Sequence, residues 1–214
     1  MFQDMIELIQ TRWDFFLQLL GEHLRISMIA IFCAMAIGLF IGILISEYQK
    51  SSKIVIGLVN FIYTIPSISL LGFLIPLSGI GDTTAIIALT VYALLPMVRN
   101  THTGLTNVSP LLIEAATGMG STKMQVLWKI KLPLALPVIL AGVRNMAVMT
   151  IALSGVASFI GAGGLGVAIY RGITTNNKAM TLIGSLLIAL LAITVDLLIG
   201  AVEKIIQKRR RQGV

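Results

Sequence analysis

Charged residues are scarce in this sequence. Only 12% of the 214 residues are Asp, Glu, Lys or Arg, against about 25% in a typical soluble domain. By contrast, 57% are hydrophobic and the mean hydropathy is +0.95. Apolar runs of about 20 residues are long enough to cross a bilayer. We therefore predict an integral membrane protein with little room for a soluble domain.

Side chains that carry chemistry are also few. Cys33 is the only cysteine and lies in an apolar run, which excludes an internal disulfide and a cysteine-based metal cluster. His23 and His102 are far apart and belong to no recognisable catalytic arrangement. The sequence has no G-x-x-x-x-G-K-[ST] loop, so the chain cannot power a reaction with ATP by itself. We expect no enzyme activity, metal or cofactor in this chain.

We do not expect residues 1–22 to be a secretory signal, because they contain Asp4, Glu7 and Asp14 and lack a basic start followed by an apolar core. Apolar side chains recur among them at helical spacing. We predict that residues 1–22 form an amphipathic helix in the membrane interface, with Trp13 near the headgroups. The alternative is a helix that packs on the membrane bundle.

Five apolar stretches follow, at 24–45, 54–77, 83–98, 134–158 and 179–202. They predict an all-α membrane protein with about five spans in a transmembrane domain, 23–204, before a basic tail, 205–214. Gly38 and Gly42 in the first stretch have a spacing that suits close helix packing.

The second stretch is interrupted by Pro66, with hydroxyl groups around it that can satisfy the backbone groups a proline frees. A kink here would line a transport pathway, or it would be only a packing bend. Tyr63, Pro66, Ser67, Ser69 and Tyr92 are our candidates for the pathway.

Two charges fall inside predicted spans, Arg144 in the fourth and Asp196 in the fifth. Each lies about two turns, ~10 Å, from the end of its span. They can pair with each other, with Asn145 nearby. The pair would be a gate or a polar pathway element, but we favour a structural ion pair or an arginine that reaches the near interface.

The segment 110–133 is too polar for a span and predicts two short helices around a glycine break. Ser109 and Pro110 suit a helix start, and Gly118 and Gly120 suit its end. Thr122 then has the spacing of a capping box with Gln125. The apolar stripe of the second helix comprises Met124, Leu127 and Trp128. We place the end of that helix at Pro133 and Pro137.

Orientation follows from the basic residues, which concentrate on the cytoplasmic side of membrane proteins. If the tail is inside, the inner side holds Lys50, Lys53, Arg99, Lys123, Lys129, Lys131, Lys204, Lys208, Arg209, Arg210 and Arg211. The outer side holds only Arg12, Arg25, Arg171 and Lys178. Five spans then put the N-terminus outside and segment 110–133 inside. This topology explains the net charge of +7 better than nucleic-acid binding does.

Segment 110–133 also resembles a known sequence signature. Glu114-Ala115-Ala116, then Gly120, then the run IKLP at 130–133 resembles the EAA signature of bacterial ABC importer permeases with the MetI-like fold. In that family this segment is the coupling helix, which docks on a cytoplasmic ATPase. The resemblance implies docking residues here: Glu114, Ala115, Ala116, Gly120, Met124 and Leu127.

The run GAGGLG at 161–166 matches G-x-G-x-x-G on paper. A dinucleotide site needs a preceding strand and an acidic residue about 20 positions later, whereas here an apolar span precedes and the next acid, Asp196, lies within a span. We reject nucleotide binding and predict a tight outer turn. The run also resembles the same permease family.

Three further runs, YTIPS at 63–67, YALLP at 92–96 and LPLALPVI at 132–139, resemble osmoprotectant permeases for glycine betaine, carnitine or choline. Methionine or amino-acid importer permeases are the alternative. The family implies a bacterial inner-membrane protein that works with two ATPase subunits carrying ATP, a second permease copy or paralogue, and a separate extracellular or periplasmic binding protein.

Aromatic residues are only 7% of the chain and form no evident cage for a quaternary ammonium group. We therefore expect selectivity to reside in the binding protein. Two other classes remain open. A channel or ATP-independent carrier would act without partners, and a membrane scaffold would dock partners without transport.

Overall fold

The computed structural model describes residues 2–212, which are almost entirely helical and contain no strand. This confirms the predicted all-α architecture. In chain order the elements are α1 (Phe2–Thr11), α2 (Trp13–Glu47), α3 (Gln49–Thr64), α4 (Ser67–Ser78), α5 (Asp82–Thr106), α6 (Pro110–Gly118), α7 (Lys123–Val126), a π-helical turn (Leu127–Lys131), α8 (Leu132–Ser154), a 3₁₀ segment (Gly155–Ile160), α9 (Gly166–Thr174) and α10 (Lys178–Gln212).

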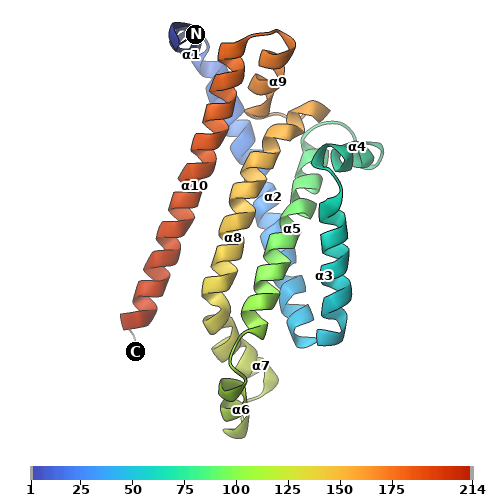
Figure 1. Ribbon diagram of the computed structural model, residues 1–214, viewed down its shortest axis with the longest axis vertical. Coiled ribbons are helices and arrows are strands. Elements are labelled where there is room, and N and C mark those ends of the chain that lie inside the picture. Colours follow the sequence, from blue (N-terminus) through green and yellow to red (C-terminus); the bar gives the residue numbers. More distant parts are fainter. Residues whose placement is uncertain (1, 213–214) are drawn as a thin grey trace.

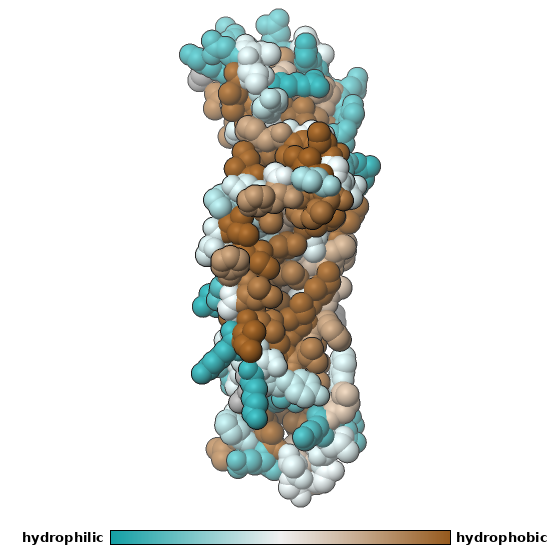
Figure 2. All heavy atoms as spheres, turned by 90° about the vertical axis from the view of Figure 1, so that its right-hand side faces the viewer, coloured by the Kyte–Doolittle hydropathy of each residue, from teal (hydrophilic) through white to brown (hydrophobic). Residues whose placement is uncertain are grey.

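The core of the bundle is the contact of α2, α5 and α8, which run side by side in Figure 1. Helix α3 packs beside α5, and α10 packs on α8 and α9. Glycines let the core helices touch: a side chain at Gly42 would collide with Thr101 of α5, and one at Gly142 with Asn100. Figure 2 shows a broad hydrophobic band between hydrophilic ends, as a membrane-spanning bundle requires.

Within residues 2–212, four helices are long and apolar enough to span a membrane, and the pair α3–α4 makes a fifth if a bent pair counts as one span. The predicted spans therefore exist, but several are longer than expected. Helix α5 runs to Thr106 rather than ending near residue 98. Helix α10 continues through the predicted basic tail as far as Gln212, and residues 213–214 lie outside the described range.

The helix boundary near the N-terminus lies at Arg12 rather than near residue 22. Helix α1 is separate, whereas residues 13–22 continue into the first span. The reason is packing, because Phe16 and Leu19 are buried against Leu165, Met180 and other apolar residues of α9 and α10.

The predicted kink at Pro66 is a break of 98° between α3 and α4. Ile65 has the extended backbone that a residue before proline prefers. Its freed carbonyl accepts a hydrogen bond from the hydroxyl of Tyr92. Helix α4 consequently lies across one end of the bundle instead of completing a straight span (Figure 1).

The prediction of a helix end at Pro133 and Pro137 is wrong. The chain from Lys123 to Ile160 is one long helical stretch. A π-helical turn, in which the N–H of Leu132 bonds to the carbonyl of Leu127, lies directly before Pro133. A proline ring collides with the carbonyl four residues earlier in a regular α-helix, so the wider turn lets the helix continue through this position.

The close contact of α2 with α5 generates a stability prediction. Gly42→Leu should destabilise the bundle by about 1–3 kcal/mol, because the new side chain overpacks against Thr101. Gly57→Leu is the matched control, since no atom lies within 4 Å of a side chain added there. Thermal unfolding of the two purified variants in detergent tests this, and equal unfolding temperatures would contradict the assigned packing.

Candidate functional site

The segment 110–133 projects from one end of the bundle, where Figure 1 shows α6 and α7 beyond the ends of the long helices. Helix α6 begins at Pro110 after Ser109, as predicted. It ends in a Schellman motif, because the N–H of Ser121 bonds to the carbonyl of Ala116 (3.0 Å) and that of Gly120 to Thr117 (2.9 Å). Gly120 has φ +86°, the left-handed backbone this motif needs. The local backbone conformation therefore explains why the signature has a glycine at position 120.

The second half of the segment begins with the predicted capping box. The Thr122 hydroxyl accepts from the Gln125 N–H (3.3 Å), and the Thr122 N–H donates to the Gln125 side chain (2.8 Å). The box closes the first turn of α7. It therefore sets the direction in which the long helix leaves the glycine break.

The six predicted docking residues divide between two faces. Ala116 and Leu127 are buried against the protein, whereas Glu114, Ala115, Gly120 and Met124 are exposed. The outward face also includes apolar side chains that the motif does not name: Leu111, Leu112, Met119 (81% exposed) and Trp128. Exposed apolar side chains gathered on a projecting tip suit a partner groove.

An ion pair ties this segment to the rest of the bundle. Lys131 Nζ lies 2.6 Å from Glu47 Oε1, which joins the start of α8 to the end of α2. The sequence analysis missed this pair. No local pattern could have revealed it, because 84 positions separate the two residues in the sequence.

The candidate pathway residues gather around the break between α3 and α4. The rings of Tyr63 and Tyr92 meet edge to face with centroids 5.7 Å apart. Pro66 is at the break, and Ser67 and Ser69 begin α4 with half-buried side chains. The structure therefore brings the two tyrosines together although 29 positions separate them in the sequence.

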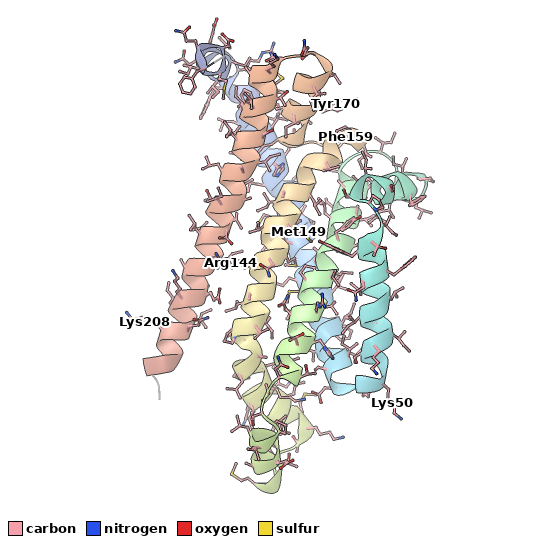
Figure 3. All side chains as sticks on the ribbon, viewed as in Figure 1. Lys50, Arg144, Met149, Phe159, Tyr170 and Lys208 are labelled. Carbon is pink, nitrogen blue, oxygen red and sulfur yellow. The ribbon has the colours of Figure 1, made fainter. Side chains whose placement is uncertain are left out.

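Arg144 and Asp196 form a bidentate pair between α8 and α10. Arg144 Nε and Nη2 donate to the two carboxylate oxygens at 2.5 and 2.6 Å. Arg144 lies on the side of α8 near α10 (Figure 3). Gly200 leaves room for the guanidinium group, whose carbon would lie 3.4 Å from an added Cβ. Asn145 is exposed on another face of α8.

At the opposite end of the bundle, the glycine-rich turn at 161–166 is held by acidic side chains. The N–H of Gly163 donates to Asp82 Oδ1 (3.1 Å), and that of Gly164 to Glu22 Oε2 (3.0 Å). Arg25 pairs with the same Asp82. The N–H groups that a phosphate would use are occupied by the protein's own carboxylates, which supports the rejection of nucleotide binding.

His23 completes this contact. The N–H of Leu165 donates to His23 Nδ1 (3.3 Å), so the ring proton is on Nε2, which faces the Ile151 carbonyl (3.0 Å) and the Ser154 hydroxyl (2.7 Å). The imidazole thus links α2 to α8 and to the turn. We name Glu22, His23 and Asp82 the outer clasp, after the outer turn that the sequence predicts for the glycine-rich run.

The family model described as binding-protein-dependent transport system inner membrane component matches residues 16–212. The chain belongs to this family. The permease is thus a multi-pass inner-membrane subunit of an ABC transporter, a subunit that is not itself catalytic. The recognition from the EAA signature is confirmed.

The permease is similar over nearly its whole length to curated relatives. It is 36% identical to the glycine betaine/carnitine/choline transport system permease protein OpuCB of Bacillus subtilis, covering 98% of this chain and 97% of the relative. It is 40% identical to the osmoprotectant import permease protein OsmW of Salmonella typhimurium, covering 86% and 88%.

Among solved structures, the permease resembles an inward-facing conformation of the MetNI methionine ABC transporter. The TM-score is 0.83 at 27% identity, covering 89% of this chain and 95% of the solved one. This likeness confirms the MetI-like fold.

The outer clasp generates a prediction. His23→Leu should destabilise the permease by about 1–3 kcal/mol for each buried group left without a partner, chiefly the Leu165 N–H. Ser27→Ala is the control, because this buried hydroxyl bonds only carbonyls of its own helix. Thermal unfolding in detergent compares the two, and a His23→Leu variant as stable as the control would argue against the clasp.

The Arg144–Asp196 ion pair between α8 and α10 generates a further prediction. Asp196→Leu alone should lower the yield of folded permease, because it leaves the Arg144 guanidinium unpaired within a span. The double variant Arg144→Leu with Asp196→Leu should recover the yield. Fluorescence-detected size-exclusion chromatography measures both. A double variant that folds normally but transports nothing would instead assign the pair to the pathway.

Proposed function

We propose that this permease forms the translocation pathway of an ABC importer for a quaternary ammonium osmoprotectant, namely glycine betaine, carnitine or choline. The observation that carries the proposal is the agreement among its relatives. The permeases of 36–40% identity from Bacillus subtilis, Listeria monocytogenes and Salmonella typhimurium are all named for these substrates or for osmoprotectants, and the chain covers at least 82% of each.

The projecting segment 110–133 is the proposed contact with a cytoplasmic ATPase. Its exposed face combines Glu114, Gly120 and Met124 with apolar side chains such as Met119. Lys123 and Lys129 flank this face and suit acidic residues of a partner. Two ATPase subunits, each engaged by one of two permease copies or by this chain and a paralogue, complete the proposed assembly.

The proposed topology places this segment inside the cell and the outer clasp outside. Support comes from the distribution of charge, since Lys50 and Lys208 lie toward the same end of the bundle as α6 and α7 in Figure 3. A substrate-binding protein would then approach the opposite end, which is formed by α4, α9 and the glycine-rich turn.

The geometry supports alternating access in which a displacement at α7 is transmitted along α8 as a rigid helix. Because the chain from Lys123 to Ile160 is one helical stretch, a displacement of α7 by a closing ATPase reaches the far end of α8. The Lys131–Glu47 pair would carry the same displacement into α2. At the outer end, α2 and α8 are joined again through His23 and Ser154. Movement inside would therefore reposition the glycine-rich turn outside.

Reconstitution tests the proposal. The permease, with candidate ATPase and binding-protein partners in proteoliposomes, should take up labelled glycine betaine only when ATP is present. Methionine uptake alone would assign the permease to the methionine class that its solved structural neighbour represents. Flux without ATP or partners would refute the importer and favour a channel.

A coupling variant sharpens this experiment. Gly120→Trp should abolish most ATP-dependent uptake, because the side chain obstructs a close approach to the ATPase and strains the Schellman motif. Gly79→Trp is the matched control, because Gly79 also has a positive φ and open surroundings but lies at the other end of the bundle. Equal losses in both variants would show backbone strain rather than a docking defect.

A further inference from the structure

Both tyrosines at the α3–α4 break have their hydroxyls engaged. The Tyr92 hydroxyl donates to the Ile65 carbonyl, and the Tyr63 hydroxyl donates to Met149 Sδ of α8 at 3.4 Å. Because these bonds fix both side chains, the rings hold a defined edge-to-face arrangement. Tyr92 is buried at 6% exposure and supports the pair from within, whereas Tyr63 keeps 42% of its surface open.

The open ring lies in a region of the permease without positive charge nearby in the sequence. Between Lys53 and Arg99, which includes most of α3, all of α4 and the first two-thirds of α5, the only charged residue is Asp82. The recorded partners of the two hydroxyls are both acceptors, the Met149 sulfur for Tyr63 and the Ile65 carbonyl for Tyr92. The face of a tyrosine ring is itself negative, so a cation brought here meets favourable electrostatics.

The neighbouring face of α8 carries small and polar side chains. Asn145 and Ala152 lie four positions before and three after Met149, hence on the same side of the helix, and both are exposed. Large apolar side chains would be expected on a face that only contacts lipid. Small and polar residues beside an exposed tyrosine instead suit a water-accessible path.

We propose that Tyr63, backed by Tyr92, is a contact site for the trimethylammonium group of the substrate within the permease. The inference rests on the proposed osmoprotectant function and adds a specificity-determining residue to it. A cation over the face of an aromatic ring is attracted to its quadrupole. Two rings do not form a complete cage, and such a weak site suits a pathway, because a transported ligand must also leave.

The experiment measures binding to the assembled permease–ATPase complex in detergent without the binding protein. Equilibrium dialysis follows labelled tetramethylammonium and its displacement by choline. The uncharged analogue of choline, in which a tert-butyl group replaces trimethylammonium, tests the role of charge at constant shape. We expect choline to displace the probe and the uncharged analogue to fail.

Variants at Tyr63 separate the ring from the hydroxyl. Tyr63→Leu should weaken binding about 5- to 30-fold, which corresponds to about 1–2 kcal/mol. Tyr63→Phe should retain binding, because it keeps the ring and loses only the bond to Met149. Fluorinated phenylalanines at the same position should weaken binding progressively as the ring face becomes less negative.

Tyr170→Leu is the matched control. Tyr170 is 41% exposed and also belongs to an edge-to-face pair, with Phe159 at 5.2 Å, but it lies near the outer end of the bundle (Figure 3). Its removal should leave probe binding unchanged. Co-purification of the ATPase shows that each variant is assembled, so a loss of binding is not a loss of the complex.

The outcomes distinguish this inference from the proposed function. If the wild-type importer takes up betaine or choline while Tyr63→Leu binds and transports normally, the site is refuted and the function stands. Equal weakening by Tyr63→Phe and Tyr63→Leu, or displacement by the uncharged analogue, would also refute it. If the wild type transports no quaternary ammonium compound, both proposals fall.

Discussion

A backbone amide inside a bilayer has no water to bond with, so each N–H and C=O must find a partner within the protein. Regular helices satisfy this requirement by themselves, and the irregular parts of the permease show how it is met elsewhere. The Tyr92 hydroxyl bonds to the Ile65 carbonyl at the α3–α4 break. Carboxylates and an imidazole bond to three successive N–H groups of the glycine-rich turn. Polar side chains therefore supply the hydrogen bonds that the backbone lacks where these helices stop.

A small number of contacts also connects the two ends of the bundle. The π-helical turn before Pro133 keeps α7 and α8 in one piece, and the Lys131–Glu47 pair joins that piece to α2. At the far end, His23 of α2 bonds Ser154 of α8. Two helices linked at both ends move together more readily than either moves alone. This arrangement suits a subunit whose proposed work is to convert a movement on one side of a membrane into an opening on the other.

Several features were predictable because they depend on neighbours along the chain. The capping box at Thr122 and Gln125 and the helix start at Pro110 are local, as are the apolar lengths of the spans. The effect of the prolines was predictable only in part. Pro66 interrupts its helix as predicted, with a break of 98°, whereas Pro133 does not end a helix, because the π-helical turn accommodates it.

Composition and local pattern by themselves determined a helical membrane protein, its spans and the projecting segment with its signature, because hydropathy and capping act over a few residues. Only the tertiary structure decided which distant side chains meet. Glu22 and His23 reach the glycine-rich turn more than 140 positions later, and Tyr63 meets Tyr92 and Met149 from three different helices. Such contacts depend on how the helices cross and rotate, which close packing at Gly42 and Gly142 sets and no short stretch of sequence contains.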